Sequence, residues 1–141
     1  MDLKRGNKYL FDTTVFIGWF RGHSEARKLV HQARFQNIFV AYSIITEAEL
    51  WAGIRDLRTP EQHIALLKPF HRYFINVTIA RRGGELRSLL AQSGIAKGRV
   101  PGIADCIIAA TAEYYELTVC SKNTRDFNLF KQYAIQVAEY H

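Results

Sequence analysis

The stretch that decides the fold lies near the start of the chain and reads Tyr9-Leu10-Phe11-Asp12-Thr13-Thr14-Val15-Phe16-Ile17. Its three leading apolar residues stop abruptly at Asp12, which predicts a short buried strand that ends at this acid. A loop or the start of a helix follows at Thr13, and the renewed apolar run ends at Arg21–Gly22. The stretch therefore predicts a strand that presents a carboxylate at its carboxyl end.

The same alternation of apolar strands and helical patterns continues along the rest of the chain. Further strands are expected over 37–41, 74–78, 117–120 and 135–138, and helices over 25–35 (with Ser24 as N-cap), 43–54, 59–70, 80–93 and 103–115, with a turn over 123–127 and a short helix near 129–133. Strands that alternate with helices are typical of an α/β sandwich with a mainly parallel central sheet. No linker or internal repeat interrupts the pattern, so residues 1–141 are expected to form a single domain.

Composition places the chain among ordinary globular proteins. Hydrophobic residues make up 48% of its 141 residues, which is enough for a core and excludes a disordered chain. Cys106 and Cys120 both lie in apolar runs and are expected to be buried free thiols, as in a reducing compartment. The polar opening segment is unlike a signal peptide, and no apolar run is long enough for a membrane span. A cytoplasmic protein without membrane contact is expected.

The charge balance is basic, with 19 Lys and Arg against 13 Asp and Glu and a net charge of +6. If four acids belong to one site, nine acidic residues are left to face 19 basic ones. An acidic pocket in a basic surround would suit chemistry on a phosphate backbone. A solvated basic surface with no nucleic-acid partner is the alternative that charge alone leaves open.

Four acids occupy positions where a parallel sheet could gather them. Asp12 and Asp126 follow expected strands, Asp105 begins an apolar helix, and Glu49 lies within another helix. Ligand crevices of such sheets lie outside the carboxyl ends of the strands. Clustered carboxylates repel one another and either take up protons or bind a cation. Oxygen ligands without Cys or His suit Mg²⁺, with Mn²⁺ as a substitute.

Each acid also has a local explanation that spacing does not remove. Asp12 could cap the following helix, and Asp105 could simply favour the positive end of a helix dipole. Glu47 and Glu49 could face solvent, and Asp126 could be a turn or N-cap residue. Convergence of the four side chains is therefore a prediction for the structure to decide.

The chain resembles PIN-domain proteins, in particular the VapC-type toxins of toxin–antitoxin pairs. The resemblance rests on four segments that follow the family's order and span nearly the whole chain. They are Tyr9–Ile17, Ser43-Ile44-Ile45-Thr46-Glu47-Ala48-Glu49-Leu50-Trp51-Ala52-Gly53, Ala104-Asp105-Cys106-Ile107-Ile108-Ala109-Ala110-Thr111-Ala112 and Leu117-Thr118-Val119-Cys120-Ser121-Lys122-Asn123-Thr124-Arg125-Asp126-Phe127. A PIN-like three-layer α/β/α sandwich is the fold that this resemblance implies.

The resemblance also implies a metal-dependent endoribonuclease, with a metal site formed by Asp12, Glu49, Asp105 and Asp126. Glu49 matches the family's Thr-x-x-Glu-Leu pattern, and Glu47 does not. Residues two apart on a helix point about 200° apart, so the two glutamates cannot share one site. Polar positions beside the metal are matched by Thr13, Ser121 and Asn123, whereas Thr14 stands where many relatives carry Asn and puts one hydrogen bond in doubt.

Partners follow from the same resemblance. The family implies an RNA substrate, a small antitoxin protein that inserts a segment into the groove, and a homodimer. A Mg²⁺ ion held by the carboxylates would activate water and stabilise charge on the phosphodiester that is cleaved. Basic residues near the expected crevice mouth are candidates for contact with the RNA backbone, namely Arg21, Lys97, Arg99, Lys122 and Arg125.

Two alternative functions use the same residues. A phosphoaspartate-type phosphotransfer domain would also place Asp12 at a strand end, although Thr14 occupies the position where one such family needs a second Asp. A non-catalytic RNA-binding PIN module would keep the groove without activity. All four acids are present, which favours the enzyme over this second alternative.

Overall fold

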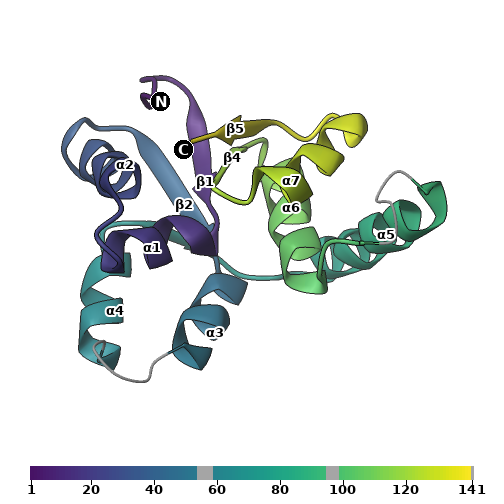
Figure 1. Ribbon diagram of the computed structural model, residues 1–141, viewed down its shortest axis with the longest axis horizontal. Helices are drawn as coiled ribbons and strands as arrows, with labels where there is room; N and C mark the ends of the chain where they lie inside the picture. The colour runs from purple at the N-terminus through teal and green to yellow at the C-terminus, as the bar shows by residue number, and fades with distance from the viewer. Residues whose placement is uncertain (54–58, 95–98, 141) are drawn as a thin grey trace.

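The computed structural model describes residues 1–53, 59–94 and 99–140. The described residues form a five-stranded sheet in the order β3-β2-β1-β4-β5 (Figure 1), and each of its pairings is parallel. Its strands are β1 (Lys8–Phe11), β2 (Phe39–Ser43), β3 (His71–Tyr73), β4 (Thr118–Ser121) and β5 (Val137–Glu139). The prediction of a mainly parallel sheet is confirmed.

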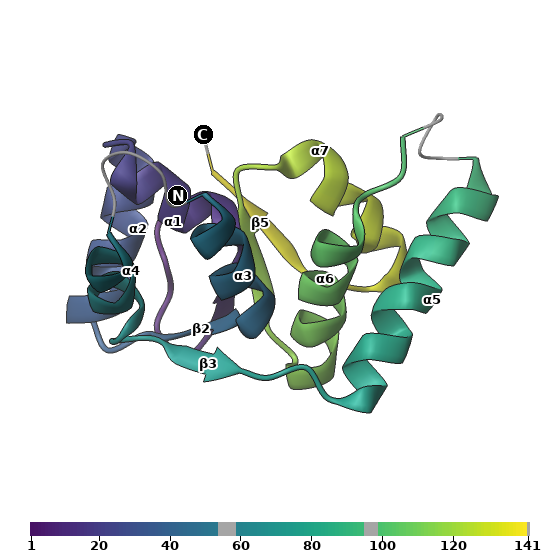
Figure 2. The same ribbon diagram turned by 90° about the horizontal axis from the view of Figure 1, so that it is seen from below.

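Helices cover the sheet on both faces. They are α1 (Thr13–Phe20), α2 (Ser24–Phe35), α3 (Ile44–Ala52), α4 (Pro60–Leu67), α5 (Val77–Ser93), α6 (Ile103–Tyr115) and α7 (Thr124–Phe127), followed by a 3₁₀ turn over Asn128–Tyr133. Figures 1 and 2 show α1, α2 and α4 on one side of the strands and the paired α5 and α6 on the other. This arrangement is the expected three-layer α/β/α sandwich.

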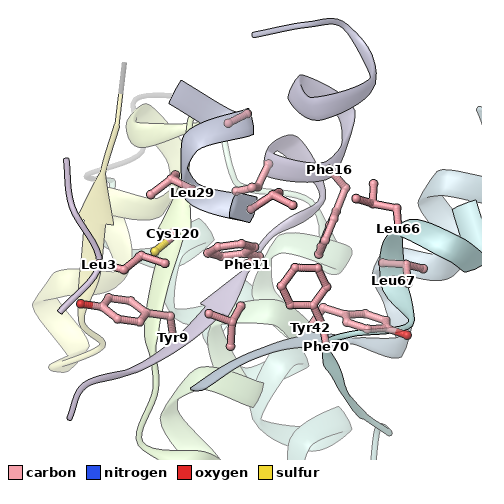
Figure 3. Packing of buried hydrophobic residues seen from close by; sticks show 14 of the residues in the cluster. Leu3, Tyr9, Phe11, Phe16, Leu29, Tyr42, Leu66, Leu67, Phe70 and Cys120 are labelled. Carbon is pink, nitrogen blue, oxygen red and sulfur yellow. The ribbon is translucent and has the colours of Figure 1, made fainter. Parts of the chain in front are cut away.

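The apolar strand runs are explained by burial on both faces. Tyr9 and Phe11 of β1 point into one hydrophobic cluster, which Figure 3 shows packed with Phe16 and Leu29 from α1 and α2. Leu10, between them, belongs to the second cluster beneath α5 and α6. Strands covered on both sides need apolar residues at every position, and so they lose the alternating pattern of a half-exposed strand.

The central position of β1 brings distant segments together at one edge of the sheet. Phe11 of β1 pairs with Cys120 of β4, and the Asp12 amide donates to the Cys120 carbonyl at 3.1 Å. On its other side β1 pairs with β2, which leads directly into α3. The carboxyl ends of β1, β2 and β4 therefore lie next to one another, as the sequence predicts for a parallel sheet.

The strand expected over 74–78 is wrong. The structure places β3 earlier, and α5 already begins at Val77. The cause is Asn76, whose side chain accepts a hydrogen bond from the Ile79 amide at 2.8 Å and caps the helix. Phe74 is 65% exposed, so the apolar pattern around it marks a surface segment.

Smaller differences concern the ends of elements. Ser24 does not cap α2, because His23 Nδ1 accepts from the Ala26 amide at 3.3 Å and is the true N-cap. The turn expected over 123–127 contains the helical turn α7. Helix α3 ends at Ala52 and α4 at Leu67, while the expected extension of α3 to 54 lies outside the described residues.

Two further expectations concern the thiols and the membrane. Cys106 and Cys120 are buried and free, as predicted from their apolar surroundings. Within the three described ranges, no helix combines the length and the apolar character that crossing a bilayer requires.

Candidate active site

The four predicted acids approach one another at the carboxyl edge of the sheet. Asp12 follows β1, Glu49 lies in α3, Asp105 lies in the first turn of α6, and Asp126 lies in α7. The Asp105 carboxylate is close enough to Asp12, Glu49 and Asp126 to repel all three electrostatically. Four segments from across the chain therefore supply one acidic cluster.

Asp12 is held from both sides and is only 2% exposed. Its Oδ1 accepts hydrogen bonds from the Thr14 amide at 3.1 Å and from the Thr14 hydroxyl, which makes Asp12 the N-cap of α1. Its Oδ2 accepts a hydrogen bond from the Ser121 hydroxyl at the end of β4. Asp12 therefore has both roles that the sequence left open, because it caps α1 and also belongs to the acidic cluster.

The same two hydroxyls fix the segment that follows β4. Thr14 Oγ1 accepts from the Lys122 amide at 3.1 Å, and Ser121 Oγ accepts from the Asn123 amide at 2.9 Å. Each hydroxyl donates to Asp12 and accepts from this segment. Thr14 therefore does contact Asp12, although it departs from the family's usual residue at this position.

Glu49 enters the cluster through hydroxyl groups on α1 and α3. The Thr13 hydroxyl donates to Glu49 Oε1 at 2.6 Å and lies 3.0 Å from the Thr46 hydroxyl. Because Thr13 has a single hydroxyl proton, Thr46 must be the donor in that second bond. Thr46 stands three residues before Glu49, on the same face of α3.

Glu47 faces the opposite side of α3. Its Oε1 accepts from the Tyr42 hydroxyl at 2.6 Å and forms an ion pair with Arg72 on β3. This separation is what a two-residue spacing on a helix requires.

Asn123 connects the two remaining acids. Its Nδ2 lies 3.4 Å from Asp105 Oδ2 and 3.2 Å from Asp126 Oδ2, so that one amide group donates toward both carboxylates. Arg99, with a side chain 58% exposed, lies 3.7 Å from Asp126 Oδ2. Arg99 was expected to face RNA, and the structure directs its charge at the cluster.

Burial and mutual repulsion disturb the ionisation of the cluster. Burial raises the pKa of Asp12 to about 7, against the stabilising hydrogen bonds from Ser121 and Thr14. Burial, together with the charges of Glu49 and Asp126, raises the pKa of Asp105 to about 6, while the charge of Arg99 opposes them. Carboxylates in this state gain from a bound cation, which removes the cost of their negative charge.

These raised pKa values predict that the metal-free chain loses stability as pH rises. Between about pH 4 and pH 7 the folded chain binds more protons than the unfolded chain, so the free energy of unfolding falls across that window. Asp12 and Asp105 together account for about 2–4 kcal/mol between pH 5 and pH 7.5. Thermal unfolding in a chelator should give a melting temperature roughly 5–10 °C lower at pH 7.5. The Asp105→Asn variant should show a shallower slope, and a profile equally steep for both chains would contradict this account.

The donor set fits a hard divalent cation, because it consists of carboxylate oxygens with hydroxyl and amide groups beside them. Across residues 1–53, 59–94 and 99–140, no three His, Cys, Asp or Glu side chains stand in position to hold a metal ion directly. The Asn123 amide lies between Asp105 and Asp126, and hydroxyl groups of neighbouring residues donate to Asp12 and Glu49. A cation would therefore have to draw the acids together and replace some of these contacts.

The other predicted residues divide into three groups. Thr13, Ser121 and Asn123 all touch a carboxylate of the cluster. Arg21, Lys122 and Arg125 are exposed, and Lys97 lies outside the described residues.

Sequence reasoning missed two residues beside the cluster. One is Thr46, which the Thr-x-x-Glu spacing signalled. The other is Tyr140, 1% exposed, whose pKa is raised by burial and by the nearby Asp12 charge. The sequence gives no signal for Tyr140, since it follows the last strand.

Comparisons with known proteins agree with this geometry. The family described as the PIN domain matches residues 9–135. Ribonuclease VapC10 of Mycobacterium tuberculosis is 32% identical over 123 residues, which are 87% of this chain and 88% of that relative. The match to the PIN domain covers most of the chain, and the protein belongs to the PIN-domain family.

Solved structures of toxin–antitoxin complexes share the fold. One from Klebsiella pneumoniae aligns with a TM-score of 0.67 and 28% identity over 85% of this chain and 90% of that chain. VapBC2 from Rickettsia felis, bound to a promoter DNA fragment, aligns with a TM-score of 0.74 over 94% and 98% of the two chains. At 22% identity the second likeness supports the fold alone. The VapC ribonucleases of the PIN-domain family are in general metal-dependent.

Proposed function

We propose that this protein is a toxin endoribonuclease that hydrolyses RNA phosphodiester bonds with Mg²⁺ bound by Asp12, Glu49, Asp105 and Asp126. The observation that carries the proposal is the gathering of these four acids at the carboxyl edge of the sheet of a PIN-domain chain. The raised pKa values of Asp12 and Asp105 support it, because they identify carboxylates that a cation would stabilise.

The residues of the site would have separate tasks. When bound, Mg²⁺ supplies a Lewis acid that lowers the pKa of water and stabilises charge at the phosphodiester. Thr14 and Ser121 orient Asp12, and Thr13 orients Glu49, each by a hydroxyl that donates to the carboxylate. Such orienting contacts fix ligand geometry and are worth about 10–100-fold in metal affinity or activity. Asn123 sets the spacing of Asp105 and Asp126.

RNA is the substrate that the charge pattern supports. The chain carries a net charge of +6 although these acids are concentrated in one place. Arg21, Lys122 and Arg125 are exposed and are available for a phosphate backbone, whereas Arg99 pairs with Asp126. Binding through such contacts weakens as the salt concentration rises.

The phosphotransfer alternative fits the geometry less well. A nucleophilic aspartate needs a free oxygen that an incoming phosphoryl group can reach. Asp12 is buried, and each of its carboxylate oxygens already accepts a hydrogen bond. The non-catalytic RNA-binding alternative shares the whole cluster and is distinguished by activity.

The proposal is tested by assaying cleavage of total RNA with purified protein that has been stripped of any co-purifying partner. We expect cleavage with Mg²⁺, its loss in a chelator, and its return with Mg²⁺ or Mn²⁺. Mg²⁺ should also raise the melting temperature of the chain at pH 7.5, because a ligand that binds only the folded state stabilises it. RNA binding without cleavage in both ions would instead support the non-catalytic module.

We also infer that a small antitoxin restrains the protein and that the toxin forms a homodimer. The similar solved structures are toxin–antitoxin complexes, which supports the first inference. Exposed apolar side chains beside the edge strand β3, Phe74 at 65% and Val77 at 63%, support a further protein contact. Light scattering that finds only a mass near 16.2 kDa for the purified chain would exclude the homodimer.

A further inference from the structure

A pocket adjoins the acidic cluster on the side of α1 and α2. Its volume is about 430 Å³, and it lies between α1, the turn into α2 and the segment after β4. Its lining consists of Thr14, Ile17, Gly18, Arg21, Gly22, His23, Lys122 and Asn123. None of the acids of the cluster is among these residues.

The pocket shares walls with the cluster. Thr14 lines it while its hydroxyl donates to Asp12, and Asn123 lines it while its amide lies against Asp105 and Asp126. A group bound in the pocket would therefore lie one side chain away from the carboxylates. An RNA strand with a phosphate at the carboxylates would therefore bring its neighbouring nucleotide toward this pocket.

Two exposed cations border the pocket. Arg21 ends α1 and Lys122 follows β4, and within the described ranges neither side chain forms an ion pair or a side-chain hydrogen bond. The basic groups that pair internally, such as Arg99 with Asp126, contrast with them. Unpaired cations beside a concave surface attract an anion, and a phosphate group is the anion that the proposed substrate supplies.

The rest of the wall is largely apolar. A side chain at Gly18 would bring its Cβ to 2.8 Å from Ala26 Cβ, so glycine lets α1 and α2 pack closely there. The same position lies 3.5 Å from His23 Cβ, which places the His23 side chain beside this backbone surface. Ile17 completes the wall. Aromatic and aliphatic surfaces next to cations are how proteins hold unstacked bases of single-stranded RNA.

We propose that this pocket receives the base of the nucleotide next to the scissile phosphate and gives the enzyme its sequence preference. The proposal rests on the proposed ribonuclease function and deepens it. The base stacks on His23 and packs against Ile17, while Arg21 and Lys122 hold the adjoining phosphates.

Two substitutions of His23 separate stacking from helix capping. His23→Asn removes the ring but keeps an N-cap acceptor for α2, since Asn is a favoured N-cap residue. His23→Phe keeps a ring and removes the acceptor. We expect the wild type to prefer particular bases at one position beside the cut in a randomised single-stranded RNA library. The preference should persist in His23→Phe and fall about ten-fold in His23→Asn.

The cations are tested with a double variant and a matched control. Arg21→Ala/Lys122→Ala should lower kcat/KM on single-stranded RNA about ten-fold or more and reduce its salt dependence. Lys8→Ala/Arg34→Ala removes the same total charge from the amino end of β1 and the far end of α2. The control should stay within about two-fold of the wild type, since it lacks the pocket contacts.

The outcomes distinguish the proposed ribonuclease activity from the role of the pocket. A wild-type chain that cleaves no RNA with Mg²⁺ would overturn the proposed function and the pocket assignment together. A wild type that cleaves, with an unchanged base preference in His23→Asn and an unchanged kcat/KM in the Arg21/Lys122 variant, would overturn the pocket assignment alone. Variants that alter only inhibition by an antitoxin would also overturn it, because the pocket would then hold a protein segment.

Discussion

The Asp105→Asn variant is expected to cleave RNA about a thousand-fold more slowly than the wild type. Asp105 lies between the other acids, and its charge interacts with Asp12, Glu49 and Asp126. The proposed metal contributes several kcal/mol of stabilisation at the reacting phosphate, and each 1.36 kcal/mol is ten-fold in rate. Loss of the central carboxylate should remove most of that contribution. The measurement is initial rates on one labelled RNA at saturating Mg²⁺.

The fold of this variant should remain intact, which makes the loss of activity interpretable. Burial and two neighbouring charges raise the pKa of Asp105 to about 6, so a neutral amide of the same shape relieves repulsion. In metal-free buffer at pH 7.5 the melting temperature should equal or exceed that of the wild type. Undiminished cleavage by a folded Asp105→Asn chain would remove Asp105 from the proposed site.

The second large effect is expected from Glu49→Gln, with Glu47→Gln as its matched control. Both substitutions remove one negative charge from α3, two residues apart on the same helix. Glu49 accepts a hydrogen bond from Thr13 and faces the cluster, and its loss should lower cleavage about a hundred-fold. Glu47 faces Tyr42 and Arg72, so its replacement should leave the rate within about two-fold.

The comparison between these two variants isolates geometry from charge. If removal of any acid from α3 impaired RNA cleavage equally, the effect would be one of net charge or of helix stability. Equal rates for Glu47→Gln and Glu49→Gln would therefore contradict the assignment of Glu49. Urea unfolding of both variants provides the control for stability, because Glu47 also holds Arg72 across to β3.

The fold could be predicted wherever burial alone set the pattern. Tyr9–Phe11 reads as a strand because each residue is buried on one face or the other. The segment 74–78 also contains Phe, Ile and Val, yet Asn76 accepts a capping hydrogen bond from the Ile79 amide, and the chain enters α5 there. The preference of individual residues for strand or helix does not show which apolar segment has a neighbouring strand to pair with. Tertiary contacts decide whether such a segment becomes a strand or part of a helix.

The acidic residues of the site could be predicted from the sequence, whereas the residues that hydrogen-bond to them were harder to predict. Asp12 and Asp126 follow strand ends, which topology gathers at one edge without further information. Asp105 and Glu49 lie in helices that the sequence marks as packed, the family resemblance implies the same two residues, and the structure brings both to the cluster. The contact of Thr14 with Lys122 joins residues 108 apart, and no local pattern predicts such a hydrogen bond.

The position of Asp12 has a practical consequence for preparing an inactive form of the protein. Its carboxylate begins α1 and also joins that helix to the end of β4, so its removal would combine an inactive site with a weakened scaffold. Asp105 lies in the first turn of α6, a helix without a side-chain cap, and among the described residues its carboxylate accepts a hydrogen bond from the Asn123 side-chain amide alone. Crystallisation trials with uncleaved RNA should therefore use a substitution at Asp105 and leave the carboxyl end of β1 untouched.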